Sequence, residues 1–340
     1  MSNRVAVLGT GLIGTSVALG LADAGWTCVG WDPDPTVLEA VDGRGAFDEL
    51  RESPDAAVAD ADVVILAGPP SSVPGLLAGL TTDALVTDVA GVKAGIVGAG
   101  PAPAHFVSGH PMAGREVSGP AAASASLFRG AAWIVITDDA ADEDLARLEN
   151  LARVLGAEPI RMTAAEHDDA VAVISHLPQV LAAALVGEAT EHPAGVGLAS
   201  GSFRDLTRVA ASNPDLWAEL LIRNGAPLAA VLEAYAARLH RWADAVRSGE
   251  SETVNRSLRT ASEVRRGMAP PVVAVAVALA DQPGELAKVG HALERSSVDV
   301  RDLQLRHATY GGGGILTLSV RPGEAETLRT ALLAEGLLLG

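Results

Sequence analysis

The sequence has one cysteine in 340 residues, so no disulfide bond can form within the chain. Cys28 lies inside an expected strand, where burial explains it better than reactivity does. The sequence also lacks an apolar run of the roughly twenty residues needed to span a bilayer. Its N-terminus lacks the basic-then-apolar layout of a signal peptide. These absences predict a soluble, cytoplasmic protein.

Basic residues are scarce, since 25 lysines and arginines stand against 42 aspartates and glutamates, for a formal net charge of −17. The resulting field repels polyanions and disfavours nucleic acid or an anionic membrane as a partner. An anionic substrate must therefore meet a locally cationic pocket. No spacing of cysteine, histidine and acidic residues indicates a metal site. The length and the hydrophobic content of 49% suit two or three domains.

A glycine-rich turn near the N-terminus is the strongest local signal. Residues 4–8 form an apolar strand that leads into Gly9, Gly11 and Gly14, and a helical pattern follows. Gly9 permits a sharp turn, Gly11 lets a pyrophosphate approach the backbone, and Gly14 lets the helix pack closely on the strand. This order predicts a dinucleotide-binding turn, with the helix N-terminus facing the phosphates.

An acidic residue indicates which dinucleotide is bound. The second strand, 26–31, ends at Asp32, eighteen positions after Gly14. A carboxylate there accepts hydrogen bonds from both ribose hydroxyls and repels a 2′-phosphate, so the sequence predicts NAD rather than NADP. The predicted cofactor-binding residues are Gly9, Gly11, Leu12, Ile13, Gly14, Asp32 and Val89.

Strand and helix patterns alternate through the first half of the chain. Expected strands after Asp32 are 62–68, 84–89, 106–109, 132–137 and 158–162, and expected helices are 35–41 and 143–155. Alternating strands and helices predict a parallel sheet in an α/β fold of the Rossmann type. The NAD-binding domain is therefore expected to cover residues 1–163.

A long apolar helix is expected next. Thr163 and Glu166 form a capping-box signature, and residues 164–189 then have a nearly all-apolar helical pattern. Such a helix is expected to be buried and kinked at Pro178.

More helices complete the middle of the chain. They are expected at 215–223, behind the cap Asn213-Pro214, and at 226–247 and 252–266. Residues 164–267 thus predict an all-helical domain that buries its apolar faces against a second copy, as a homodimer.

The C-terminal segment has a different pattern. Residues 267–271 have the composition of a linker. Beyond them come a strand, a helix, two strands and a helix, expected at 272–280, 284–295, 298–307, 314–321 and 324–335. With a short last apolar segment, this order predicts a ferredoxin-like domain over residues 272–340.

Two histidines are candidates for chemistry. His110 follows the strand 106–109, and the carboxyl ends of strands are where open α/β sheets bind ligands. Its imidazole can remove a hydroxyl proton as hydride leaves for the cofactor, whereas the alternative is a loop histidine with local hydrogen bonds. His176 lies on the long helix, where a buried structural histidine is an equal alternative.

Two arginines are candidates for binding a carboxylate. Arg204 and Arg208 are one turn apart beside Asp205, so they share a helix face. Guanidinium groups stay charged when desolvated and bind carboxylates through two hydrogen bonds. A surface salt-bridge cluster would have the same pattern.

Five strings in order resemble the prephenate and arogenate dehydrogenase family of tyrosine biosynthesis, over essentially the whole chain. They are Gly9-Thr-Gly-Leu-Ile-Gly-Thr-Ser16, Asp88-Val-Ala-Gly-Val-Lys93, His110-Pro-Met-Ala-Gly114, Ser175-His-Leu-Pro178 and Phe203-Arg-Asp-Leu-Thr-Arg208. The string Asp281-Gln-Pro-Gly284-Glu-Leu286 is similar to the loop of an ACT regulatory domain, which implies an aromatic amino acid such as tyrosine or phenylalanine as a bound effector.

The resemblance implies an NAD-dependent oxidative decarboxylation, in which hydride leaves C4 of a cyclohexadienol ring and the ring carboxylate departs as CO2. His110 would act as the base at the C4 hydroxyl, and Arg208 would bind a substrate carboxylate. The residues implied at the substrate are Gly91, Arg115, His176, Gln179, Arg204 and Arg208.

Three positions depart from the family pattern. Gly91 stands where a serine is common, Gln179 where a second histidine is common, and Arg115 where a small hydroxylated residue is common. All three would face one pocket. The missing serine hydroxyl leaves a second hypothesis open, in which the substrate is 4-amino-4-deoxyprephenate from an antibiotic pathway. A third hypothesis is a catalytically silent, NAD-binding amino-acid sensor.

Overall fold

The computed structural model describes residues 3–114, 119–192, 201–268, 272–307 and 313–339. The chain divides into two compact units, residues 1–237 and residues 238–340. Arg115 lies outside the described residues, so its predicted role stays a prediction.

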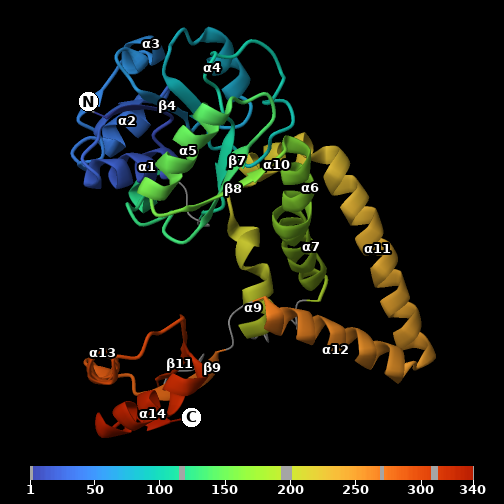
Figure 1. The fold of residues 1–340 in the computed structure, drawn as a ribbon. Coiled ribbons are helices and arrows are strands. Elements are labelled where there is room, and N and C mark those ends of the chain that lie inside the picture. Colours follow the sequence, from blue (N-terminus) through green and yellow to red (C-terminus); the bar gives the residue numbers. More distant parts are fainter. Residues whose placement is uncertain (1–2, 115–118, 193–200, 269–271, 308–312, 340) are drawn as a thin grey trace. The chain divides into compact units, whose positions relative to one another are not determined.

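A five-stranded parallel sheet organises the N-terminal part of the first unit (Figure 1). Its order is β3-β2-β1-β4-β5, and its strands are β1 (Arg4–Leu8), β2 (Thr27–Trp31), β3 (Glu49–Leu50), β4 (Val63–Leu66) and β5 (Leu85–Asp88). The connecting helices are α1 (Leu12–Asp23), α2 (Pro35–Val41), α3 (Pro54–Val58) and α4 (Val73–Gly79). The predicted Rossmann-type sheet is confirmed: β1, β2, β4 and β5 lie within a few residues of their expected positions, whereas the short edge strand β3 was not predicted.

Both faces of this sheet are covered because successive side chains of a strand point to opposite faces. In β1, Val5 and Val7 belong to the core that includes Leu21 of α1. Ala6 and Leu8 belong to a second core that includes Leu77 of α4. An unbroken apolar strand is therefore the pattern expected of a parallel sheet with helices on both sides.

A second, three-stranded sheet follows, in the order β6-β7-β8. It contains β6 (Gly109–Pro111), β7 (Ala132–Ile136) and β8 (Glu158–Met162), with helix α5 (Asp142–Val154) between the last two and a 3₁₀ turn η1 (Pro120–Ala122) before β7. Strands β7 and β8 are parallel, and β6 runs antiparallel to β7.

The expected parallel strand at 106–109 is wrong in detail. Phe106 forms only an isolated parallel bridge with Val86 of β5. At Ser108 the chain leaves that edge, because the carbonyl of Ser108 accepts the amide of Ile136 in β7. His110 therefore lies within β6, where it pairs with Ile134, rather than in a loop behind a strand.

The long apolar helix is built from three segments, α6 (Ala164–Val171), a π-helical turn η2 (Ala172–His176) and α7 (Leu177–Thr190), which Figure 1 shows as one green rod. The capping box is confirmed, since Thr163 and Glu166 each bond the other's backbone amide. The kink expected at Pro178 is not observed as such. The irregular turn precedes the proline, and Pro178 lies in the first turn of α7.

The expectation that this helix is buried all round is also wrong for the single chain. Val173 and Ile174 are 50% and 64% exposed, and Val186 is 37% exposed. By length and composition alone, Ala164–Thr190 is apolar enough to cross a membrane, contrary to the expectation that no such run exists. The same test is passed by helices that pack inside a protein core, so it is weak evidence for a membrane span.

The remaining helices are α9 (Gly201–Thr207), the 3₁₀ turn η3 (Arg208–Ala211), α10 (Pro214–Arg223), α11 (Gly225–Ser248) and α12 (Ser251–Gly267). As predicted, Asn213 caps α10, because its side-chain oxygen accepts the amides of Asp215 and Leu216. The part of 164–268 that the structure describes contains helices and turns and no strand.

The C-terminal residues form an antiparallel sheet with the order β10-β11-β9-β12. The elements are β9 (Val273–Leu279), α13 (Glu285–Ser296), β10 (Asp302–His307), β11 (Gly314–Val320), a 3₁₀ turn η4 (Pro322–Glu324), α14 (Ala325–Ala334) and β12 (Leu338–Leu339). Alternate residues of β9 and β11 join Leu328 and Leu332 of α14 in a separate core. This core is independent of the two cores around the parallel sheet.

Replacing Thr163 with alanine should lower the free energy of unfolding by about 1 kcal/mol, because the first turn of α6 loses its cap. Urea denaturation of the purified chain measures this loss. Thr190→Ala, at the other end of the same rod, is the control and should cost less. Equal losses in the two variants would contradict a specific role for the cap.

Candidate active site

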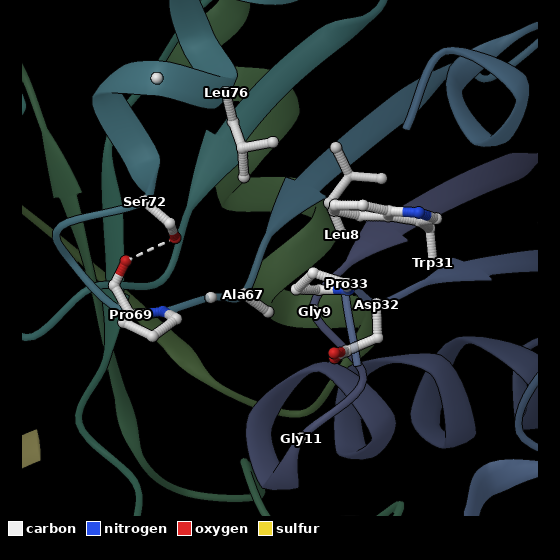
Figure 2. Close-up of a pocket in the computed structure, with 12 residues that line it drawn as sticks. Leu8, Gly9, Gly11, Trp31, Asp32, Pro33, Ala67, Pro69, Ser72 and Leu76 are labelled. Carbon is white, nitrogen blue, oxygen red and sulfur yellow. Dashed lines mark hydrogen bonds between the residues drawn. The ribbon is translucent and has the colours of Figure 1, made fainter. Parts of the chain in front are cut away.

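A cavity of about 470 Å³ opens at the carboxyl ends of β1, β2 and β4 (Figure 2). Its lining combines the glycine turn with apolar side chains and one carboxylate. The lining residues are Leu8, Gly9, Gly11, Trp31, Asp32, Pro33, Ala67, Gly68, Pro69, Ser72, Gly75 and Leu76. In Figure 2 Trp31 and Leu8 are drawn next to each other, and the Asp32 carboxylate points toward the start of α1.

The three glycines of the turn meet three different constraints. Gly9 has φ of +108°, and a Cβ there would lie 2.6 Å from the carbonyl carbon of Ala67. A Cβ on Gly14 would lie 1.9 Å from the carbonyl oxygen of Gly9. A Cβ on Gly11 would meet no heavy atom within 4 Å, so the absent side chain leaves open space at the helix N-terminus. That space fits a pyrophosphate against backbone amides.

Asp32 is held in place by the same turn. One carboxylate oxygen accepts the amide of Thr10 at 2.7 Å, and the other accepts the amide of Asp34 at 3.0 Å. Leu12 and Ile13 begin α1 and are partly buried, whereas Val89 is buried in the same core against which Ile13 packs. Of the predicted cofactor residues, Gly9, Gly11 and Asp32 line the cavity, whereas Leu12, Ile13 and Gly14 lie in α1 and Val89 is buried after β5.

Three side chains form a hydrogen-bonded chain that ends on His110. Nδ1 of His110 is 2.8 Å from Nε2 of His167, and Nδ1 of His167 is 2.8 Å from a carboxylate oxygen of Asp168. Burial alone would raise the pKa of Asp168, but hydrogen bonds from His167 and from the amides of Lys93 and Ala94 outweigh burial and lower that pKa. Asp168 is therefore an ionised acceptor.

The carboxylate at one end of this chain determines where the lone pair lies at the other. With the Nδ1 proton of His167 directed to Asp168, Nε2 of His167 can accept a proton from Nδ1 of His110. Nε2 of His110 then carries a free lone pair. That nitrogen faces Gly91, since a Cβ on Gly91 would lie 3.6 Å from it. Burial, followed by the positive charge of Lys93, lowers the pKa of His110 well below its ordinary value.

His176 is 2% exposed and is fixed by two neighbours. Its Nδ1 accepts the side-chain amide of Asn224 at 3.0 Å, and its ring is edge-on to Trp217 with centroids 6.0 Å apart. Burial lowers the pKa of His176, although the Asp168 charge opposes that effect. Gln179, on the first turn of α7, is 7% exposed, and its side-chain oxygen is buried without a hydrogen-bond partner.

The two arginines do not share a regular helix face as predicted. Helix α9 ends at Thr207, and Arg208 begins the 3₁₀ turn that packs on α7. Arg204 and Arg208 are both exposed, whereas His167 and His176 are buried and His110 is half-buried. The change from α to 3₁₀ geometry alters the rotation between the two side chains, which the spacing of four residues could not indicate.

His167 and Asp168 were missed by sequence reasoning. Nine residues separate His167 from His176, which at about 100° per residue places them on opposite sides of a regular α-helix. The wider π turn between them brings both side chains into the interior. The string that follows the capping box, with a histidine directly before two aspartates, was the available signal.

Comparisons with known proteins give consistent results. A family model described as the nucleotide-binding domain of prephenate dehydrogenase matches residues 17–162, and one described as its dimerization domain matches residues 163–260. The prephenate dehydrogenase of Bacillus subtilis is 29% identical over 94% of this chain and 92% of its own. That of Lactococcus lactis is 31% identical over 87% of each chain.

A solved structure extends the likeness to the fold and the cofactor. The prephenate dehydrogenase of Aquifex aeolicus, in complex with hydroxyphenyl propionate and NAD⁺, is 27% identical to this chain. It superimposes with a TM-score of 0.68 over 79% of this chain and 99% of its own.

Two glycine variants should separate cofactor binding from folding. Gly11→Ala should keep the melting temperature but weaken NAD⁺ binding about tenfold or more, because the methyl group fills the space left for the pyrophosphate. Gly14→Ala should destabilise the fold itself, because its Cβ would overlap the backbone at Gly9. Thermal melting and NAD⁺ titration measure both effects. Unaltered NAD⁺ affinity in a folded Gly11→Ala protein would contradict the assigned site.

Proposed function

The chain belongs to the prephenate dehydrogenase family, and we propose that it catalyses NAD-dependent oxidative decarboxylation of prephenate, of arogenate, or of both. The products would be 4-hydroxyphenylpyruvate and tyrosine, respectively. The observation that carries this proposal is the hydrogen-bonded chain from Asp168 through His167 to Nδ1 of His110, which leaves Nε2 of His110 facing Gly91. A base oriented in this way has no purpose in a protein that only binds a dinucleotide.

His110 is the proton acceptor at the C4 hydroxyl of the substrate. NAD⁺, when bound at the glycine turn, supplies the chemistry of accepting the hydride from C4. As C4 is oxidised to a carbonyl, the hydroxyl proton passes to Nε2 of His110, and the negative charge of Asp168 stabilises the imidazolium through His167. Loss of CO2 from the ring then moves an electron pair to the C4 oxygen, which takes the proton back as the ring becomes aromatic.

Substrate carboxylates need positive charge on a chain whose formal charge is −17. We propose that Arg208, with Arg204 and Arg115, supplies it. Arginine suits this task because it stays charged and binds a carboxylate through two parallel hydrogen bonds. His176 and Gln179 would then face the side chain of the substrate. The unpartnered oxygen of Gln179 favours a hydrogen-bond donor there, such as the ammonium group of arogenate.

A second candidate substrate is 4-amino-4-deoxyprephenate. The observation that favours it is Gly91, because a side chain at this position would reach to within 3.6 Å of Nε2 of His110 and Gly91 has none. A C4 amine brings its own hydrogens to the imidazole and needs no additional hydroxyl donor beside it. Leu220, 3.2 Å from the position of that absent Cβ, makes this side of the site apolar.

The substrate can be identified by offering purified protein prephenate, arogenate and 4-amino-4-deoxyprephenate with NAD⁺ and measuring NADH formation. Turnover with prephenate or arogenate is expected. His110→Asn should lower kcat by about 10²- to 10⁴-fold at unchanged NAD⁺ affinity, because the general base is lost. His105→Asn, a partly exposed histidine paired with Asp144, is the matched control. Inactivity with all three substrates, or full activity without His110, would contradict the proposal.

We further propose three domains, an NAD-binding domain at 1–163, a helical domain at 164–267 and a regulatory domain at 272–340, in a cytoplasmic homodimer. The capping box at Thr163 supports the first boundary. The apolar side chains exposed on the helices, including Ile174, Leu258 and Val264, support burial against a second copy.

The regulatory domain is proposed to be ACT-like and to bind an aromatic amino acid. Its element order, with one helix after the first strand and one after the third, supports this reading. Neither family model extends beyond residue 260, but the Bacillus subtilis relative matches 94% of the chain, which is more than residues 1–268 can account for. The loop from Asp281 to Leu286 leads from β9 into α13 and contains Gly284 with φ of +95°.

Tyrosine or phenylalanine should change the activity or the oligomeric state of the full chain, because a ligand at one site alters another only through differential binding. Asp281→Ala in this loop should weaken that response without changing turnover in its absence. Glu294→Ala, exposed on α13, is the control and should respond as the parent protein does. A chain cut at Gly267 that keeps the full response would contradict the proposed effector site.

A further inference from the structure

Lys93 is a fully buried lysine that the proposed chemistry does not use. Its ammonium group has three acceptors, a carboxylate oxygen of Asp88 at 2.7 Å, the carbonyl oxygen of Gly109 at 2.6 Å and the hydroxyl of Ser108 at 3.1 Å. These three bonds use all three of its protons. Two of the acceptors belong to the residues directly before His110.

Asp88 and the backbone around Lys93 make further hydrogen bonds, which link the Lys93 ammonium group to Asp168 on the other side of His110. Asp88 accepts the hydroxyl of Ser108 at 2.5 Å and the amide of Ala90 at 2.9 Å. The backbone amides of Lys93 and Ala94 donate to the two carboxylate oxygens of Asp168, at 2.9 and 2.7 Å. One short turn therefore holds both the strand end that carries His110 and the carboxylate that orients His167.

Titratable groups surround His110 on two sides. His167 and His176 face it from the α6–α7 rod, with Asp168 behind His167, and Lys93 with Asp88 lies on the side of β5 and β6. After burial, the positive charge of Lys93 is the largest cause that lowers the pKa of His110. Burial lowers the pKa of Lys93 itself, whereas Asp88 and then Asp168 act to keep it charged.

A charged pair in this position is difficult to explain by stability. Removing two charges from water costs several kcal/mol per ion, and well-packed apolar residues often replace a buried pair at no loss of stability. The pair is, however, well placed to act on the neighbouring imidazole. Removal of Lys93 would free the carbonyl of Gly109 and take away a positive charge beside His110.

We propose that Lys93 is a positioning residue for His110: its ammonium group holds the backbone directly before His110 and places a positive charge beside that imidazole. This inference rests on the proposed role of His110 as the base. Lys93 is fully buried, so it acts through His110, whose position and protonation both depend on it.

Lys93→Met removes the charge and keeps an unbranched side chain of comparable length. The acid limb of the kcat/KM profile should move to higher pH by about one unit, because protonation of His110 is no longer opposed. The loss of activity should thus be larger at pH 6 than at pH 8. In addition, kcat should fall about tenfold at high pH because the Gly109 carbonyl is released, while KM for NAD⁺ should stay unchanged.

The same shift can be measured without turnover. In protein with ¹³C-labelled histidine, the His110 signal, assigned by its loss in His110→Asn, should titrate at higher pH in Lys93→Met than in the parent protein. Val92→Ala is the control, because it loosens packing in the same buried turn but removes no charge. Its titration and acid limb should match those of the parent protein.

If Lys93→Met does not fold, Lys93→Met with Asp88→Asn removes both charges and leaves no lone charge in the interior. It should shift the His110 titration in the same direction by a smaller amount. An unchanged titration in whichever of these variants folds overturns the proposal, as does an equal shift in Val92→Ala. A shifted titration in a protein that turns over none of the substrates supports the role of Lys93 and contradicts only the proposed function.

Discussion

The structure depends most on the hydrogen-bonded chain from Asp168 through His167 to His110. A neutral imidazole donates from only one nitrogen, so the ionised carboxylate at one end determines the position of the lone pair at the other. The chain joins β6 to α6 and therefore needs both elements in place. Its bond between His167 and Asp168 lies in the interior, where a hydrogen bond to a charged group is only weakly screened.

The cofactor turn and the segment that leads to His110 both follow the carboxyl ends of strands in the parallel sheet. Parallel strands all present their carboxyl ends on one side, so the turn after β1 and the segment after β5 lie at the same edge of the sheet. The polypeptide then leaves the edge of β5 at Ser108 and pairs with β7, which positions His110 next to Gly91. Lys93 holds this segment from inside, with Asp88 as its counter-charge.

Sequence patterns predicted an element well where residues close together in the sequence determine its structure. The glycine turn was predictable because Gly9 and Gly14 exclude side chains through contacts within their own strand–turn–helix unit and its neighbouring strand. The start of α6 was predictable because its capping box involves residues three apart. The π turn before Pro178 and the antiparallel pairing of β6 were not predictable, because both depend on what the segment packs against.

The sequence by itself determined the dinucleotide-binding turn, the order of the elements and the resemblance to one enzyme family, because these depend on backbone preferences and periodicity over a few residues. Only the tertiary structure decided that His167, 57 residues from His110, is its partner, and that the turn at Lys93 bonds Asp168, 75 residues away. Hydrogen bonds over such separations arise from how the α6 helix packs on the sheet, and no pattern within either segment encodes that packing.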